Sequence, residues 1–336
     1  MHLINRRTLL AQWAAGSTLM AATASFAQTA KAVGAKTAPV SKLSQKLRIV
    51  IPANAGGGWD QTGRALGSAL LATGSVDNIE YENKGGKGGT LGLAYYAEKY
   101  AADPHTLIMG GTVMVGAVAL QKPVVDMGVL APLARLTSDY LVMVVAANSP
   151  IKTATDLSTA MKASLKAVPV AGGSAGGVDH IFAGVFARAT GANPEDLVYL
   201  PFAGGTEVAA AVLSGKATIG VSGFSEFSAQ IASGQLRAIG VSSRKSSFGI
   251  PSMRDQGLQL DMANWRGVFT GQAVPVARQS AMVEAIRLAT QHEEWKATLK
   301  QNRWDASWLA GKDFHSQIDF DQTTARVMVH LLKLKA

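Results

Sequence analysis

The sequence predicts a two-domain α/β protein, and two observations carry this prediction. From residue 46 onward, short β-branched apolar segments alternate with amphipathic helical segments, the pattern of a parallel, doubly wound sheet. After a long apolar strand at 140–151 the pattern starts again. Two stretches, PANAGGGWD and VAGGSAGGVD, share one plan: strand, glycine loop, aspartate cap and helix. We therefore expect two similar domains, each a sheet flanked by helices, that face each other across a cleft.

The first 45 residues differ in character from the rest. A basic pair, Arg6 and Arg7, precedes an apolar stretch that ends in small residues at Ala27. This pattern is typical of a signal peptide, here 1–27, exported by the Sec or the twin-arginine route. Residues 28–45 are basic and lack a hydrophobic period, so we expect a disordered linker. No internal apolar run is long enough to span a bilayer as a helix.

The alternation predicts each element of the first domain in order. Asp60 is expected to cap the first helix. The predicted strands are 46–53, 76–83 and 106–111, and the predicted helices are 60–71 and 90–99.

The second domain is predicted in the same way, and the chain then returns to the first. The predicted strands are 166–171, 196–202, 217–223 and 237–243, and the predicted helices are 153–163, 178–191 and 205–215. A returning strand at 264–271 and three amphipathic helices follow, which we expect to pack on the first domain. The domains are therefore 46–146 plus 263–336, and 147–262.

Composition restricts the classes of function. With 336 residues, 48% of them hydrophobic, the chain can form a large core without disulfides, and it contains no cysteine. The net charge of +9 is spread without basic runs or interleaved aromatics, which argues against nucleic acid and favours a small anionic partner. The six histidines form no His-x-x-x-His pair. We expect neither a metal nor a cofactor.

Three glycine loops, 54–60, 84–90 and 172–179, precede predicted helices. A helix start exposes free N–H groups and a partial positive charge, and glycine lets an anion approach the backbone closely. Each loop alone could be a tight turn, but three at equivalent positions favour an anion site at the carboxyl ends of the strands. Trp59 lies inside the first loop. Its side chain either lines the pocket or packs against its own helix.

Nucleotide-binding motifs do not fit these loops. The dinucleotide fingerprint needs a third glycine where Gln61 stands in the first loop and Leu91 in the second. The phosphate loop needs serine or threonine after its lysine, and Gly88 follows Lys87. The loops therefore predict a different anion.

One motif supports an alternative function, a secreted serine hydrolase. Gly172-Gly-Ser174-Ala-Gly176 satisfies G-x-S-x-G between a predicted strand and helix. Asp255 or Asp261 with His292 would complete a triad in the order Ser, Asp, His, and His180 lies close by. No His-Gly-Gly oxyanion loop precedes the motif, and a hydrolase leaves the paired glycine loops unexplained.

Seven segments occur in order along the chain: PANAGGGWDQTGRAL, YENKGGKGGTLGLA, DPHTLIMGG, VAGGSAGGVDHIFAG, YLPFAGGTEVAAAVLSGKATIGVSG, IASGQLRAIGVSS and NWRGVF. Together they resemble one family, the periplasmic receptors of tripartite tricarboxylate transporters (the Bordetella uptake family). The resemblance covers the chain from about Lys46 to the C-terminus.

The resemblance implies a type II-like periplasmic binding protein, a monomer without catalytic activity, that closes like a Venus flytrap. It implies secondary transport: the receptor binds a small organic di- or tricarboxylate and delivers it to a membrane permease of a large and a small subunit. The ligand-binding residues it implies are Gly57, Gly58, Trp59, Asp60, Gly88, Gly89 and Thr90, then Ser174, Gly176, Gly177, His180, Phe202, Gly204, Gly205 and Thr206. Asp60 is assigned mainly to helix capping, because a carboxylate would repel it.

Two positions depart from the family pattern. Ser174 is the only hydroxyl residue of the third loop before Asp179, and Thr206 stands where the tricarboxylate receptors carry glycine. Both changes reshape the far end of the pocket, so the sequence leaves the particular carboxylate open. It equally leaves open whether the receptor feeds a transporter or a signalling partner.

Overall fold

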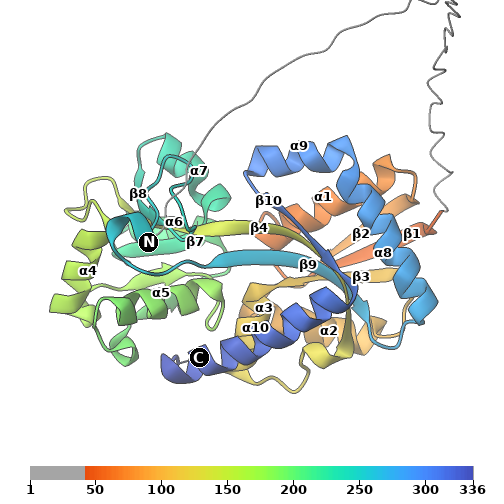
Figure 1. The fold of residues 1–336 in the computed structure, drawn as a ribbon, viewed down its shortest axis with the longest axis horizontal. Coiled ribbons are helices and arrows are strands. Elements are labelled where there is room, and N and C mark those ends of the chain that lie inside the picture. The colour runs from red at the N-terminus through yellow and green to blue at the C-terminus, as the bar shows by residue number, and fades with distance from the viewer. Residues whose placement is uncertain (1–41, 336) are drawn as a thin grey trace, which may run out of the picture. The chain divides into compact units, whose positions relative to one another are not determined.

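The computed structural model describes residues 42–335 (Figure 1). The predicted signal peptide and residues 28–41 of the predicted linker lie outside the described residues. The first strand, β1 (Ser44–Ile51), begins two residues before its predicted start, because Ser44 already pairs with Val76 of the neighbouring strand.

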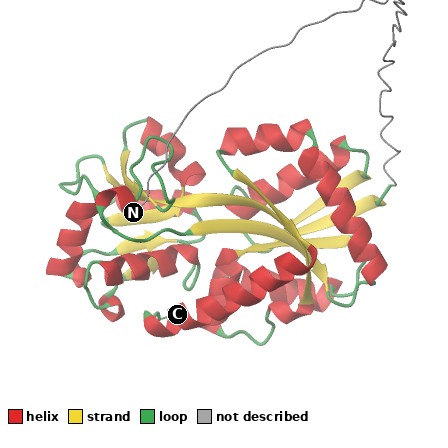
Figure 2. Ribbon diagram, in the orientation of Figure 1, coloured by secondary structure: helices red, strands yellow, loops and turns green. Residues whose placement is uncertain are grey.

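The sheet of the first lobe has the order β2-β1-β3-β9-β4-β10. β1 pairs in parallel with β2 and β3, as predicted. The returning strand β9 pairs antiparallel with both β3 and β4, so this sheet is mixed (Figure 2). The strands besides β1 are β2 (Val76–Asn83), β3 (Thr106–Gly111), β4 (Leu130–Ala146), β9 (Ala263–Gly271) and β10 (Asp305–Ala310), the last of which was not predicted.

Helices cover both faces of this sheet (Figure 1). One group is α1 (Gly58–Ala72), α8 (Val276–Gln291) and α9 (Glu293–Asn302); the other is α2 (Thr90–Tyr100), α3 (Thr112–Gln121) and α10 (Gly311–Leu331). Helix α3 was not predicted, because its sequence TVMVGAVALQ is apolar all round and shows no helical period. None of the helices within residues 42–335 combines the length and the apolar character needed to cross a bilayer.

Strand β4 runs through both lobes (Figure 1). Its first part, to Tyr140, pairs with β9, and from Leu141 it pairs with β7 and β8 instead. In the second part alternate side chains enter two different cores, Met143 with α4 and α5, and Val144 with α6 and α7. Burial on both faces explains the unbroken apolar run. The strand was predicted at 140–151 but begins at Leu130 and ends at Ala146.

The second lobe has the strand order β8-β4-β7-β5-β6. The predicted strand 166–171 is shorter than expected, because residues 165–167 form a 3₁₀ turn after α4 and only three residues reach β6 and β7. The elements are α4 (Ala154–Ala163), β5 (Val170–Gly172), α5 (Val178–Ala189), β6 (Tyr199–Pro201), α6 (Gly205–Leu213), β7 (Ile219–Gly223), α7 (Phe224–Ala232) and β8 (Leu236–Val241).

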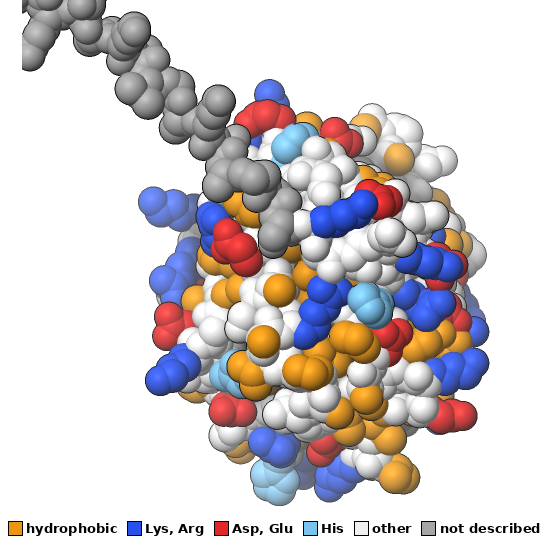
Figure 3. Space-filling model, turned by 90° about the vertical axis from the view of Figure 1, so that its right-hand side faces the viewer, with side chains coloured by type: hydrophobic (Ala, Val, Ile, Leu, Met, Phe, Trp, Pro, Cys, Tyr) orange, Lys and Arg blue, Asp and Glu red, His pale blue; other side chains and the backbone are white. Residues whose placement is uncertain are grey.

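The C-terminal helices pack on the first lobe, as predicted, but the chain's end does not. Leu332 and Leu334 pack against Ile181 and Gly184 of α5 in the second lobe. The confirmed fold class is a two-lobed α/β protein with a cleft; the exact domain boundaries remain a prediction. On the face shown in Figure 3, basic side chains are interspersed with acidic ones.

Candidate functional site

A cavity of about 700 Å³ lies between the two lobes, and four helices begin on its wall. The N-cap residue of each of α1, α2, α6 and α7 is a glycine, which has no side chain to accept a hydrogen bond from the first amides of the helix. Away from the cavity, α4 has a complete capping box at Thr153, whereas α8 and α10 also begin without a side-chain cap. Helix starts of this kind leave N–H groups for a bound anion, although Gly205 N of α6 already donates to Glu226. The four glycines that line the cavity are Gly57, Gly89, Gly204 and Gly223.

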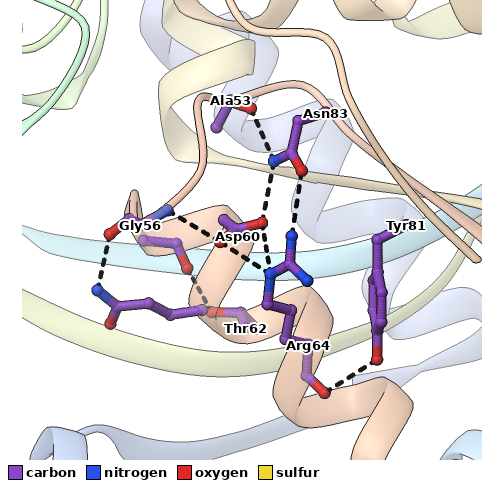
Figure 4. A network of polar contacts seen from close by, with 9 residues as sticks. Ala53, Gly56, Asp60, Thr62, Arg64, Tyr81 and Asn83 are labelled. Atoms are coloured by element: carbon purple, nitrogen blue, oxygen red, sulfur yellow. Dashed lines mark hydrogen bonds and ion pairs between the residues drawn. The ribbon is translucent and has the colours of Figure 1, made fainter.

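Asp60 shapes the first loop rather than the cavity (Figure 4). It is the third residue of α1, not its N-cap as predicted. Its carboxylate accepts hydrogen bonds from Gly56 N (2.9 Å), Asn83 Nδ2 (2.9 Å) and Arg64 Nε (2.9 Å). Burial alone would raise the pKa of Asp60, but these hydrogen bonds outweigh it and lower the pKa below its ordinary value. The carboxylate is therefore fully engaged in holding the loop.

The second loop approaches the first through Trp59. Gly89 has a φ of +91°, and a Cβ there would lie 2.7 Å from the Trp59 ring. Only glycine permits both this left-handed backbone and this close approach. Trp59 also lines the cavity, so the tryptophan forms part of the pocket wall and packs on the second loop.

Arg266 of β9 was not predicted at the site, and it contributes the guanidinium of the cavity. It forms an ion pair with Asp139 of β4, and both side chains are almost fully buried. The guanidinium lies 4.9 Å from the Trp304 ring centroid, and a Cβ at Gly58 would lie 2.7 Å from Nη2. Arg266 Nη1 has no hydrogen-bond partner among the described residues. A buried guanidinium therefore lies against the positive end of α1 with a donor to spare.

The second lobe presents two carboxylates to the same cavity, Asp179 of α5 and Glu226 of α7. Asp179 Oδ2 accepts from Gly173 N (2.8 Å), the one hydrogen bond that the described residues give to this side chain. Glu226 accepts from Gly205 N (3.3 Å) and from the Ser222 hydroxyl. The cavity is thus basic and rich in amides on the first lobe, and it contains two carboxyl groups on the second.

Gln121 joins the glycine loops of the two lobes. Its Nε2 donates to Lys87 O (3.0 Å) and Ala175 O (3.2 Å), and its Oε1 accepts from the Thr90 hydroxyl (3.2 Å). Thr90 thus supports a cavity residue without lining the cavity itself. Gln121 lies at the end of the unpredicted helix α3, which explains why sequence reasoning missed it.

The structure brings together only part of the predicted set. Gly57, Gly58, Trp59, Gly88, Gly89, Ser174, Phe202 and Gly204 line the cavity, whereas Asp60, Thr90, Gly176, Gly177, His180, Gly205 and Thr206 do not. His180 accepts from Gly176 N (3.1 Å), stacks on Tyr199 and borders a separate, smaller cavity. The cavity also contains unpredicted side chains, Asn54, Lys87, Gln121, Asp179, Ser222, Glu226, Asn264 and Arg266. The sequence offered a signal for three of these side chains. Asn264 and Arg266 belong to the segment NWRGVF, and Asp179 follows the third glycine loop.

The hydrolase triad is not assembled in residues 42–335. Ser174 lies in the cavity, but Asp255 and Asp261 are each held by neighbours in the second lobe, and His292 caps α9. The G-x-S-x-G match is therefore a glycine loop that lacks the predicted triad partners Asp255, Asp261 and His292. No three His, Asp or Glu side chains of the described residues converge in a metal-binding arrangement either.

Burial shifts two adjacent groups of α5 in opposite directions. Burial, and then the charge of Glu226, raise the pKa of Asp179 to about 8, although Gly173 N–H and Arg266 oppose this and Asp139 adds to it. Burial lowers the pKa of His180 to about 4. Between pH 4 and 8 the folded protein therefore holds the Asp179 proton that the unfolded chain releases. Between pH 4 and 6.5 it lacks the His180 proton that the unfolded chain binds.

These shifts predict how stability depends on pH. Below pH 6.5 the contributions of Asp179 and His180 to the unfolding free energy oppose each other. From pH 6.5 to 8 only Asp179 of these two groups contributes, and it lowers the unfolding free energy by up to about 1.4 kcal/mol per pH unit. Asp179→Asn should remove this decrease. Urea unfolding of both proteins at pH 5, 6.5 and 8 measures the difference, with Asp196→Asn as a surface control. Parallel profiles for the wild type and Asp179→Asn would contradict the assignment.

Two α/β lobes, joined by long strands around a cavity of helix starts, define a two-lobed solute-binding receptor. The chain belongs to the tripartite tricarboxylate transporter receptor family, whose model matches residues 75–328. This is a family of solute receptors rather than of enzymes. Among curated proteins none matches the chain in sequence.

Solved structures share the fold at low sequence identity. Periplasmic binding protein BugD has a TM-score of 0.77 at 18% identity, over 86% of this chain and 98% of its own. MatC from Rhodopseudomonas palustris, with bound malate, has a TM-score of 0.73 at 20% identity, over 84% and 98%. A second R. palustris protein, solved with adipate, has a TM-score of 0.77 at 14% identity, over 87% and 98%.

Proposed function

We propose that this protein is a periplasmic receptor that binds a small organic di- or tricarboxylate in the cavity between its lobes. The observation that carries the proposal is the convergence of four helix starts without side-chain caps on one cavity that also contains the buried Arg266. Each amide that donates to a carboxylate contributes about 1.5–3 kcal/mol where water is excluded. The malate and adipate bound by two structural relatives support the same ligand class.

The receptor delivers its ligand to a membrane permease with a large and a small subunit, as its family membership supports. Because the helix starts belong to both lobes, a ligand that contacts both favours their approach and shifts the population toward the closed form. The permease then recognises that form. Deleting the permease distinguishes transport from signalling, since only a transport receptor loses uptake.

A thermal-shift screen tests the proposal. The full chain is expressed and purified from the periplasmic fraction, where a mass beginning at Gln28 supports the predicted signal peptide. The panel contains di- and tricarboxylates, aromatic acids and simple esters. One class of carboxylate at about 100 times its Kd should raise Tm by about 5 °C or more, with saturation.

The same preparation can overturn the proposal. If no acid changes Tm, and if an ester is hydrolysed by the wild type but not by Ser174→Ala, the protein is a hydrolase. Ser174→Ala is a mild change, because the hydroxyl makes no hydrogen bond that holds the loop among the described residues.

A further inference from the structure

A second cavity, with a volume of about 170 Å³, lies next to the 700 Å³ cavity described above, which we now call the first cavity. Ala175 of the third glycine loop and Pro201 of β6 line both cavities, so these two residues lie between them. An occupant of the second cavity would therefore contact the wall of the first cavity from its other side.

His180 of α5 lines the second cavity, and its neighbours fix both the orientation of its ring and the position of its hydrogen. The side chain is 4% exposed, its Nδ1 accepts from Gly176 N (3.1 Å), and the ring stacks on Tyr199 with the centroids 4.0 Å apart. Burial lowers the pKa of His180 to about 4, so at pH 7 the imidazole is neutral and carries its hydrogen on Nε2. Nε2 has no hydrogen-bond partner among residues 42–335, which leaves a buried donor for an occupant.

Three charged side chains line the same cavity and leave one positive charge in excess. Lys333 Nζ donates to Glu195 Oε2 (2.9 Å). This hydrogen bond lowers the pKa of Glu195, and the charge of Lys335 lowers it further, so both ammonium groups lie near the carboxylate. Lys335 forms no ion pair with any of the described residues. The second cavity thus combines one neutral N–H donor with one cation that the protein leaves unbalanced, a combination that attracts an anion.

The C-terminal residues that line this cavity belong to the first lobe but pack on the second. They continue α10, whose end lies beside α5 (Figure 1). Leu332 and Leu334 pack against Ile181 and are 1% and 9% exposed. Leu334 N donates to Val329 O (3.2 Å), and Lys333 has a φ of +49°, which together form a Schellman helix end. Both lobes therefore contribute walls to the second cavity.

We propose that the second cavity is a binding site for a small oxyanion, which accepts a hydrogen bond from His180 Nε2 and whose charge is balanced by Lys335. The bound anion contacts the second lobe and the C-terminal residues of the first lobe, so it favours the form in which the lobes lie close together. A carboxylate in the first cavity favours the same form, and each ligand then raises the affinity for the other. This coupling rests on the proposed function, whereas the site itself does not.

NMR of the histidine side chains in the full chain purified from the periplasm tests the site directly. The Nε2 resonance of His180 is identified by its loss in His180→Gln. Acetate and phosphate are titrated separately at pH 7, with the ionic strength held constant by chloride. At least one of them should shift this resonance with saturation, at a Kd of about 1 mM or lower. The two titrations distinguish an organic from an inorganic oxyanion.

Two variants assign the response to the second cavity. Leu197→Trp enlarges a side chain that lines the second cavity and not the first, so it should abolish the saturable shift. Val198→Trp is the matched control, because Val198 is 36% exposed and lines neither cavity. Lys335→Gln, at an exposed position, should weaken the binding of the anion by about fivefold or more. Lys312→Gln removes the same charge at the other end of α10 and should change nothing.

Calorimetry tests the coupling between the two cavities. When the anion found by NMR saturates the second cavity, the Kd of the carboxylate in the first cavity should fall by about fivefold. In Leu197→Trp the carboxylate should still bind, but its Kd should no longer fall when the anion is added.

The outcomes separate this inference from the proposed function. If neither anion shifts the His180 resonance with saturation, or if Leu197→Trp leaves the shift intact, the second site is wrong and the carboxylate receptor stands. If the anion binds but leaves the Kd of the carboxylate unchanged, the coupling is wrong. If no acid binds in the first cavity, the proposed function fails, and the NMR titration alone decides the second site.

Discussion

Arg266→Met should raise the Kd for the carboxylate by about 100-fold or more and lower the unfolding free energy by ~3–5 kcal/mol. The substitution removes the guanidinium from the cavity and leaves the buried Asp139 without its ion-pair partner. It also removes the contact with the Trp304 ring. Urea unfolding measures the loss of stability, and calorimetry with the ligand found in the screen measures the loss of affinity.

A second variant separates these two effects. In Arg266→Met/Asp139→Leu the buried charge is removed together with its partner, and two apolar side chains fill the space. Stability should return to within about 1–2 kcal/mol of the wild type, because a buried ion pair contributes little beyond well-packed apolar groups. Affinity should stay low. If the double variant binds like the wild type, Arg266 is a structural residue and does not meet the ligand.

Gly116→Ala should weaken ligand binding by about tenfold or more with little loss of stability in the unliganded protein. A Cβ at Gly116 of α3 would lie 2.1 Å from the carbonyl oxygen of Gly176 in the third loop. That oxygen belongs to backbone, so it cannot move aside as a side chain end can. The two lobes must then move apart at this contact. This disfavours the closed form, in which helix starts from both lobes reach one ligand. Within α3 itself alanine is the better helix former.

Calorimetry measures the affinity of Gly116→Ala, and small-angle scattering with ligand reports whether the lobes still close. Gly184→Ala is the matched control, since it adds the same methyl to a helix and meets only the flexible ends of Leu332 and Leu334, at 3.1 Å. Unchanged affinity in Gly116→Ala would show that this contact between the lobes is not needed for binding.

Local patterns in the sequence determined most of the elements and the class of site. The strand β2 at 76–83, the strand β3 at 106–111 and the capped helix α4 follow directly from apolar periodicity and caps, which act over a few residues. The glycine loops likewise predicted helix starts that could meet an anion. Each of these features depends on neighbours in the chain, so the sequence alone contains it.

The sequence analysis missed the elements that show no hydrophobic periodicity, and it missed them for a common reason. Helix α3 is apolar all round because it packs on several sides, and the early part of β4 gave no alternation because both of its faces are covered. Burial on all sides removes the polar stripe that sequence reasoning depends on. The edge strand β10 was missed although it pairs with β4, since DASWLA is short and weakly patterned.

The sequence by itself determined the fold class, the family resemblance and the glycine loops. Tertiary structure alone decided which side chains share the cavity. Arg266 and Asp139 are far apart in the chain and meet because β4 and β9 pair antiparallel, while Asp179 and Glu226 meet because α5 and α7 both begin at one edge of the second sheet. The polarity of the cavity is a property of that pairing, and no local pattern encodes it.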